Sequence, residues 1–418
     1  MVATLAAELE RWGYVGVITP IYEYDEVLRR GLGGPSRALR LVEPSTGEVL
    51  ALRPDLTAQV ARLVATRLSH EAGPLRLYYQ GSVVRLPLAG AAAELFQVGV
   101  ELIDAPQNAG DLEVVLLAQA ALGAVGVTAL TLDLGHAEVI RAALDGLEPS
   151  LVTELVAALR KREVARLAEL GREAKLPAPR RKLLEALPML HGGVEVLARA
   201  RKMIAAQKRT AEMRRATTAL DELEVLVAQL TKLGAVERVG IDLGEVRGFD
   251  YYTGTRFVVY AEGAGAQVAS GGRYDRLIER YGRAARATGF ALDVDEVAAL
   301  LRARGIEAPR ASGGVLVGGD PVTAAWLAAI ARKRGLRAVL DLESDEPKGD
   351  PKGDPKRDKE RQARAVRQQL SRIIVVNRAG ARWLDPNSAT RTTRLSAPAW
   401  RRALAGDVDA LDALLPTS

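Results

Sequence analysis

The feature that most constrains the fold of this chain is an abrupt change of pattern in its middle. Residues 1–145 alternate helix-like and strand-like segments, among them the strand-like run VGVIT at 15–19. Residues 150–235 instead carry apolar residues at three- and four-residue spacing, with almost no strand pattern. Strand patterns return at RVGIDL (238–243) and TRFVVYAEG (255–263). We therefore expect one α+β sheet domain that a helical insertion divides into two halves.

A second change of pattern begins at residue 314. The run GVLVGGDPVTAAWLAAIARKRGLRAVLDLE reads as strand, tight turn, helix and strand, which is typical of a parallel α/β domain. The predicted organisation is a first half of the sheet core at 1–149, a helical insertion at 150–236, a second half at 237–310 and a small α/β domain at 311–418. Inside the last domain, EPKGDPKGDPKRDKERQ (346–362) has no apolar residue, so we predict a disordered insert at 345–362.

The composition excludes several classes of protein. The 418 residues contain no cysteine, which excludes disulfides and thiolate metal sites, and the three scattered histidines argue against a histidine-based zinc site. We expect no cofactor. No apolar stretch reaches the roughly 18 residues that span a bilayer, and charges come too early for a signal peptide, so we expect a cytoplasmic protein without a membrane partner. The net charge is +6, but aromatic residues make up only 4%, so we do not expect tRNA or other RNA to bind.

The first candidate site residues are Asp55 and Thr57 in the run LRPDLTAQVAR (52–62). This run reads as the end of a strand followed by the start of a helix. Asp55 could pair with an α-ammonium group, and Thr57 could hydrogen-bond to the same ligand. Both residue types are also common helix N-caps, and from this run alone capping is the stronger interpretation.

The second group of candidates lies on a predicted β-hairpin at 76–104, which carries Arg85, Gln97 and Glu101. Gln97, Gly99 and Glu101 share one face of a strand, because side chains alternate between the two faces. We expect Gly99 to leave room for a ligand and Glu101 to accept an N–H from a cationic or imidazole-like group, since a buried carboxylate needs such a partner. A solvated sheet face is the alternative.

The third group comes from the strings VRGFDYYTG (246–254) and SGGRYD (270–275). Aromatic walls with a few placed polar groups are typical of a pocket for a small molecule. Tyr251 and Tyr252 would supply such walls, and Arg247 could hold a carboxylate through a bidentate pair. Plain packing of the tyrosines within a sheet is the alternative.

Together these segments resemble the histidyl-tRNA synthetase branch of the class II aminoacyl-tRNA synthetases, over about residues 1–305. GYVGVITPIYE (13–23) is similar to the first class II motif, RLYYQGSVVR with FQVGVE to the second, and the run GFALDVDE (289–296) to the third. The resemblance implies the class II sheet core, a self-dimer through that core and a histidine pocket. The implied histidine-binding residues are Asp55, Thr57, Arg85, Gln97, Glu101, Arg247, Tyr251 and Tyr252.

Two departures from that family concern ATP. The segment after Arg85 continues as LPLAGAAA (86–93), without the charged and polar residues that would hold ATP, and Glu296 stands where the family has a phosphate-binding arginine. A carboxylate about 4 Å from a phosphate repels it by roughly 1 kcal/mol per charge pair in water, and by more in a drier pocket. We therefore expect that ATP is not used.

A histidine pocket without an ATP site resembles the regulatory subunits of ATP phosphoribosyltransferase. The resemblance implies a non-catalytic chain that assembles with a short-form catalytic subunit. It further implies that L-histidine acts as the effector, through feedback on the first step of histidine biosynthesis. The alternative is a divergent histidyl-tRNA synthetase, which activates histidine with ATP and charges tRNA.

Overall fold

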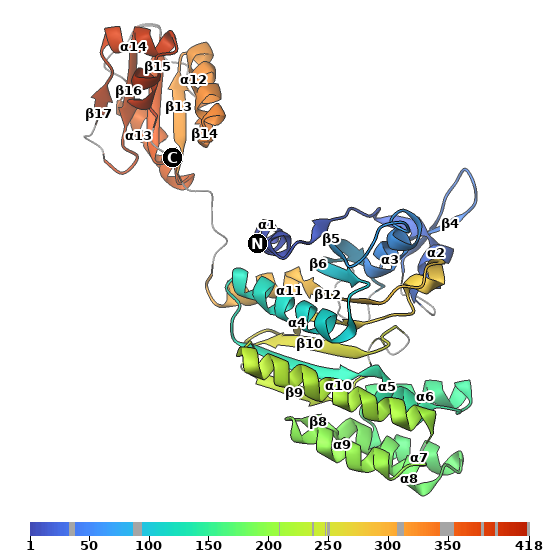
Figure 1. The fold of residues 1–418 in the computed structure, drawn as a ribbon. Coiled ribbons are helices and arrows are strands. Elements are labelled where there is room, and N and C mark those ends of the chain that lie inside the picture. The colour runs from blue at the N-terminus through green and yellow to red at the C-terminus, as the bar shows by residue number, and fades with distance from the viewer. Residues whose placement is uncertain are drawn as a thin grey trace. The chain divides into compact units, whose positions relative to one another are not determined.

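The computed structural model describes residues 1–32, 38–86, 94–208, 210–235, 238–246, 248, 251–306, 313–342, 355–377, 380–388 and 392–415. The chain forms two compact units, Met1–Ile306 (unit 1) and Glu307–Ser418 (unit 2), which can be followed in Figure 1. No helix in the described ranges is long and apolar enough to cross a membrane.

Unit 1 is built on a nine-stranded sheet with the order β1-β5-β6-β12-β11-β10-β7-β9-β8. The strands are β1 (Val15–Gly16), β5 (Leu75–Val84), β6 (Glu94–Ile103), β7 (Leu130–His136), β8 (His191–Gly192), β9 (Arg238–Asp242), β10 (Thr255–Ala261), β11 (Gln267–Arg273) and β12 (Ala287–Asp293). Within the stretch β5-β6-β12-β11-β10-β7, each strand is antiparallel to the next. Two pairs are parallel: β1 with β5, and β7 with β9. The central strands thus come from both sides of the helical insertion.

Helices cover one face of this sheet and leave part of the other face for the site. The helices α1 (Val2–Arg11) and α4 (Gln107–Ala124) pack on the face where Val98, Val100 and Leu102 of β6 are fully buried. Because side chains alternate along a strand, Gln97 and Glu101 point to the opposite face. On that side the chain places α3 (Thr57–Thr66) and η2 (Ile278–Tyr281), which pack against each other and enclose a second apolar cluster.

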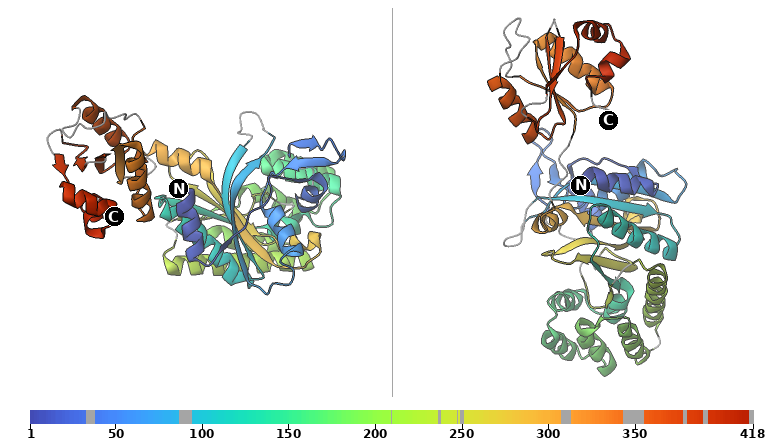
Figure 2. Two further views of the ribbon diagram at one scale, coloured as in Figure 1. Left: turned by 90° about the horizontal axis from the view of Figure 1, so that it is seen from above. Right: turned by 90° about the vertical axis from the view of Figure 1, so that its left-hand side faces the viewer.

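The helical insertion shares the core of the large sheet. Its helices are α6 (Pro149–Arg160), α7 (Val164–Glu173), α8 (Ala178–Ala186), α9 (Glu195–Ala205) and α10 (Ala211–Leu233), with a short η1 (Leu187–Met189). Figures 1 and 2 show them gathered beside the β9 and β8 end of the sheet. The helix α10 packs along α5 (Ala137–Leu144) and buries Leu220, Leu223 and Leu230 in the same cluster as the sheet residues.

A small three-stranded sheet completes unit 1, in the order β2-β4-β3. Its strands are β2 (Tyr22–Tyr24), β3 (Arg40–Val42) and β4 (Val49–Leu52), and α2 (Asp25–Leu32) packs beside them. The helix α11 (Val294–Ala303) follows β12 directly and packs on β6 and β11. The end of β12 is therefore also the start of a helix, at the edge of the cavity described below.

Unit 2 is a five-stranded sheet with helices on both faces. The strand order is β14-β13-β15-β16-β17, in which β14 (Ala338–Leu340), β13 (Val315–Gly319) and β15 (Arg372–Asn377) are parallel and β16 (Gly380–Leu384) and β17 (Thr392–Arg394) are antiparallel. The helices are α12 (Pro321–Lys333), α13 (Pro355–Arg367), α14 (Ala397–Leu404) and α15 (Val408–Asp412). Asp320 begins α12 as its N-cap, since its side chain accepts from the Thr323 N–H.

The predicted disordered insert at 345–362 was wrong in its second part, because α13 begins at Pro355. Arg361 is 1% exposed and donates from Nε to Asp341 Oδ2 at 2.8 Å. Asp358 accepts from both terminal nitrogens of Arg382, at 2.6 and 2.8 Å. These charged residues are ordered by partners that lie far away in the sequence, which composition cannot reveal. Residues 345–354 lie outside the described residues.

Candidate functional site

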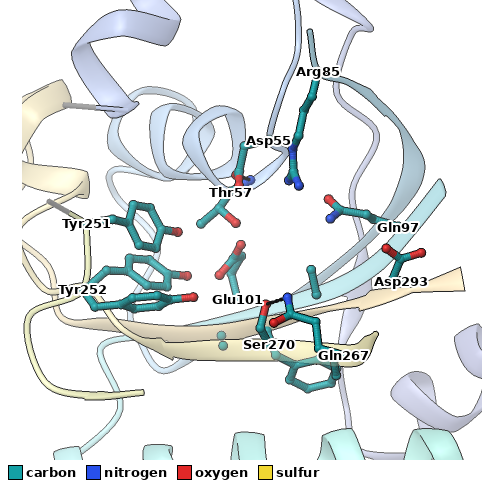
Figure 3. Close-up of a pocket in the computed structure, with 16 residues that line it drawn as sticks. Asp55, Thr57, Arg85, Gln97, Glu101, Tyr251, Tyr252, Gln267, Ser270 and Asp293 are labelled. Carbon is teal, nitrogen blue, oxygen red and sulfur yellow. Dashed lines mark hydrogen bonds between the residues drawn. The ribbon is translucent and has the colours of Figure 1, made fainter. Parts of the chain in front are cut away.

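A cavity of about 120 Å³ lies on the sheet face opposite α4. The strands β6, β11 and β12 form its floor, and the start of α3 and the segment at 251–252 form its walls (Figure 3). Its lining residues are Asp55, Thr57, Arg85, Gln97, Glu101, Tyr251, Tyr252, Gln267, Ala269, Ser270, Gly271, Tyr274, Gly289, Phe290, Ala291 and Asp293.

The cavity brings together seven of the eight site residues that the sequence predicts: Asp55, Thr57, Arg85, Gln97, Glu101, Tyr251 and Tyr252. The eighth, Arg247, lies outside the described residues. These seven come from three separate stretches of the chain, on either side of the helical insertion.

Glu101 is the central acidic group of the cavity. It is 2% exposed, and neither carboxylate oxygen has a hydrogen-bond partner with normal geometry among the described residues. Burial raises the pKa of Glu101 well above its usual value, although the nearby hydroxyls of Thr57 and Tyr79 lower it in part. Glu101 lies so close to Gly289 that a Cβ there would collide with its carboxylate. A buried carboxylate without a partner is costly, so this arrangement favours a ligand that donates an N–H.

The expected room beside Gly99 is not available to a ligand. A Cβ at Gly99 would collide with the hydroxyl of Tyr79 and with the backbone carbonyl of Phe290. Tyr79 pairs with Gly99 across β5 and β6, is 2% exposed and lies 3.4 Å from Thr57 Oγ1, measured from its hydroxyl oxygen. Gly99 therefore accommodates a buried tyrosine of the protein, and the prediction about its role was wrong.

Asp55 and Thr57 hold the start of α3 and also line the cavity. Asp55 Oδ1 accepts from the Thr57 backbone N–H at 2.7 Å just before α3, whose N-cap residue is Leu56 and has no side-chain cap hydrogen bond. The Arg85 Nε donates to the Pro54 carbonyl at 2.8 Å, which ties the end of β5 to the same segment. Asp55 thus orders the residues at the start of α3 and also lines the cavity.

One end of the cavity is aromatic. The rings of Tyr251 and Tyr252 meet edge to face with centroids 5.0 Å apart, and Tyr251 and Tyr274 are also 5.0 Å apart. The Tyr274 hydroxyl is buried and has no hydrogen-bond partner within the described part of the chain. The sequence signal for Tyr274 was present in SGGRYD, but that string did not show which of its residues face the cavity.

The neighbours of Tyr274 in that string have a different role. Arg273 is 1% exposed and points to the α4 side, where Nη2 donates to Asp111 Oδ1 at 2.7 Å and to the Gln107 carbonyl at 3.0 Å. Asp275 accepts from Arg273 at 3.1 Å and from the Ala287 N–H at 3.0 Å. Arg273 thus ties the end of β11 to α4, and Asp275 ties it to β12.

The polar end of the cavity contains residues that were not among the predicted site residues, namely Gln267, Ser270 and Asp293. Gln267 donates to Ser270 Oγ at 3.3 Å within β11. Asp293 lines the cavity at the end of β12, and its Oδ1 caps α11 by accepting from the Glu296 N–H at 3.2 Å. Burial raises the pKa of Asp293, while the Glu296 N–H and, more weakly, Arg85 lower it. Glu296, which stands where the synthetase family has a phosphate-binding arginine, is not among the lining residues.

The charges in the cavity suit a ligand with more than one positive or N–H group. Three carboxyl groups line it, those of Asp55, Glu101 and Asp293, against the guanidinium of Arg85 among the described residues. Within those residues no group of His, Asp and Glu side chains is arranged to hold a metal ion.

Comparisons with known proteins identify relatives of this chain. A model of the histidyl-tRNA synthetase family matches residues 1–297. The ATP phosphoribosyltransferase regulatory subunit of Moorella thermoacetica is 41% identical over 340 residues, which are 80% of this chain and 85% of that protein. The protein of the same name from Cupriavidus pinatubonensis is 41% identical over 309 residues, 71% of this chain and 77% of its own.

The likeness extends to solved structures. An ATP phosphoribosyltransferase regulatory subunit/histidyl-tRNA synthetase from Bacillus halodurans has a TM-score of 0.71 and 30% identity, with coverage of 90% of this chain and 92% of that one. That coverage reaches beyond the residues of unit 1. The predicted fold class, an α+β core like that of the class II aminoacyl-tRNA synthetases with a small C-terminal α/β domain, is confirmed.

Proposed function

The chain belongs to the family of ATP phosphoribosyltransferase regulatory subunits, and on that premise we propose that it binds free L-histidine and regulates a catalytic partner. The partner would be the short-form catalytic subunit, which needs this chain for activity. Histidine would provide feedback on the first step of histidine biosynthesis, and both proteins would act in the cytoplasm. Catalysis would take place in the partner, and this chain would use no cofactor.

The observation that carries the proposal is the pair of unsatisfied polar groups in the cavity, the Glu101 carboxylate and the Tyr274 hydroxyl. A ligand that enters this space must supply hydrogen-bond donors and acceptors at both groups, because buried polar groups are normally paired. An imidazole ring meets this need with two ring nitrogens and a flat face for the tyrosines. In this pose the α-ammonium group would lie near Asp55, Thr57 and Gln97.

Feedback requires that histidine binds one state of the assembly more tightly than another, since a ligand shifts an equilibrium only by its differential affinity. The cavity walls join elements from both halves of unit 1, so a ligand there would bias how those elements pack. We propose that the partner responds to this bias.

A self-dimer through the synthetase-like core is the second part of the proposal. Large apolar side chains are exposed on β1, on the three-stranded sheet and between them: Val15, Ile18, Ile21, Tyr22, Tyr24, Leu39, Leu41, Val42 and Val49. Exposed apolar side chains in this number favour an interface, and a second copy would present the same side chains in return. Light scattering tests this part of the proposal, because a chain that stays monomeric at micromolar concentration would contradict it.

Calorimetric titration with L-histidine tests the pocket. We expect the purified chain to bind histidine and Glu101→Ala to bind it roughly 10- to 100-fold more weakly, as expected for a lost charged hydrogen bond. Glu224→Gln, on the exposed side of α10, is the matched control and should bind like the parent chain. Equal histidine affinity of the parent chain and Glu101→Ala would show that the pocket is misassigned.

The alternative function, a divergent histidyl-tRNA synthetase, is favoured by the family match over residues 1–297 and by the position of Arg85 in the cavity. A synthetase activates its amino acid with ATP before it charges tRNA. Histidine-dependent exchange of pyrophosphate into ATP by the purified chain would establish this alternative. Its absence, together with stimulation of a short-form partner, would support the regulatory function.

A further inference from the structure

The cavity has two chemically different ends. Figure 3 shows Tyr251 and Tyr252 at one end and Gln97 and Asp293 at the other, with Thr57 and Glu101 between them. If the ring of the ligand lies at the aromatic end, the other end receives the part of the ligand that differs between a free amino acid and its activated or phosphorylated derivatives. The charges at that end therefore decide which derivative can bind.

Arg85 and Asp293 set the charge at the polar end. Arg85 is the only cation that lines the cavity within the described ranges, and its Nε is already engaged by the Pro54 carbonyl. Asp293 is the strand partner of Gln97 between β12 and β6. Both side chains line this cavity, and the charge of Arg85 lowers the pKa of Asp293 in part. The Asp293 carboxylate thus offsets the positive charge that would otherwise attract a phosphate.

We propose that Asp293 is the specificity-determining residue that excludes phosphate-bearing ligands from this pocket, and the inference rests on the histidine-binding function proposed above. A free amino acid brings an ammonium group for the carboxylates that line the cavity and a single carboxylate for Arg85. A phosphate ester or anhydride brings further negative charge for which no cation remains among the described lining residues. Repulsion by Asp293 then outweighs the attraction of Arg85.

The structure assigns this role to Asp293 and not to Glu296, although both lie at the start of α11. Glu296 does not line the cavity, and a Cβ placed on Gly265 would lie 4.0 Å from its Oε2, so its carboxylate extends toward the loop between β10 and β11. Asp293 lies at the end of the cavity floor itself. Glu296, which the sequence comparison singles out, therefore lies one helical turn after Asp293, which lines the cavity.

Two substitutions that remove the same charge from the same turn test the inference. Asp293→Asn keeps the helix cap, because asparagine caps as well as aspartate does. Glu296→Gln removes the neighbouring charge outside the cavity. Inorganic pyrophosphate is the probe, titrated alone by calorimetry at low ionic strength, so that the result does not depend on histidine binding.

We expect Asp293→Asn to bind pyrophosphate about tenfold or more tightly than the parent chain, as expected when one repulsive charge is removed at close range. Glu296→Gln should match the parent, and adding Arg85→Gln to Asp293→Asn should abolish the gain. An unchanged pyrophosphate affinity in Asp293→Asn, or an equal gain in Glu296→Gln, would overturn the inference. Failure of the parent chain to bind histidine would instead contradict the proposed function, and the two results are measured separately.

Discussion

Two buried carboxylates of unit 1 have opposite surroundings. Glu101 on β6 is 2% exposed, and neither of its carboxylate oxygens accepts a hydrogen bond of normal geometry from the described residues, whereas Asp111 on α4 is 5% exposed and accepts two hydrogen bonds from Arg273. Burial raises the pKa of both carboxyl groups, but the charge of Arg273 counteracts the effect at Asp111. The two residues lie on opposite sides of the same sheet.

The difference separates a binding group from a structural group. A buried carboxylate that is already paired holds elements together, and its loss or the loss of its partner is costly. A buried carboxylate without a partner weakens the folded state, and such groups gather where a ligand supplies the missing contact. The predictions below test this distinction, and the expected effects decrease from the first to the last.

The largest effect is expected when the paired carboxylate loses its partner. Arg273→Met should lower the free energy of unfolding by about 3–5 kcal/mol, because it leaves Asp111 buried and uncompensated. Urea denaturation followed by far-UV circular dichroism measures this. The double variant Arg273→Met with Asp111→Leu should recover part of the loss, since it removes the orphaned charge. A loss below about 1 kcal/mol in the single variant would contradict a structural role for the pair.

A smaller effect of opposite sign is expected at the unpaired carboxylate. The folded-state pKa of Glu101 is raised above its ordinary value of 4.5, so the stability associated with this group is complete below about pH 4.5 and is lost as pH rises through the raised value. At pH 7 the ligand-free Glu101→Gln chain should therefore be more stable than the parent, with the difference shrinking toward pH 4. We expect a difference of about 1–3 kcal/mol, the usual cost of a buried polar group without a partner.

Chemical denaturation of both chains at several pH values measures this difference. A parent chain that is more stable than Glu101→Gln at pH 7 without ligand would show that Glu101 has a partner in the protein. Histidine at one fixed concentration should stabilise the parent chain more than Glu101→Gln, by mass action.

The smallest effect is expected at an exposed carboxylate. Glu224 on α10 pairs with Arg201 at 3.0 Å, and its side chain is 46% exposed. Glu224→Gln should change the free energy of unfolding by less than about 0.5 kcal/mol, because an exposed ion pair is screened by water. The same denaturation assay measures it, and a change above about 1 kcal/mol would mean that burial does not set the order of these effects.

Much of the fold could be predicted from local sequence patterns. The helical spacing of residues 150–235 indicates the insertion, because that periodicity depends only on near neighbours in the chain. The strings around Asp55, Glu101 and Tyr251 carry the residue types of an amino-acid pocket, and the structure places these residues around one cavity. The prediction of disorder was wrong for residues 355–362, which belong to α13. The partners that order Asp358 and Arg361, namely Arg382 and Asp341, lie elsewhere in unit 2.

The sequence by itself therefore determined the order of elements, the family resemblance and the chemical types available for a site. Only the tertiary structure decided what each side chain meets. Strand alternation places Arg273 and Tyr274 on opposite faces, but the packing of α4 on one face makes Arg273 structural and leaves Tyr274 in the cavity. In the same way, the tertiary structure decides that Asp293 lines the cavity and Glu296 does not. The physical reason is that periodicity is local, whereas burial and pairing depend on neighbours brought together from distant parts of the chain.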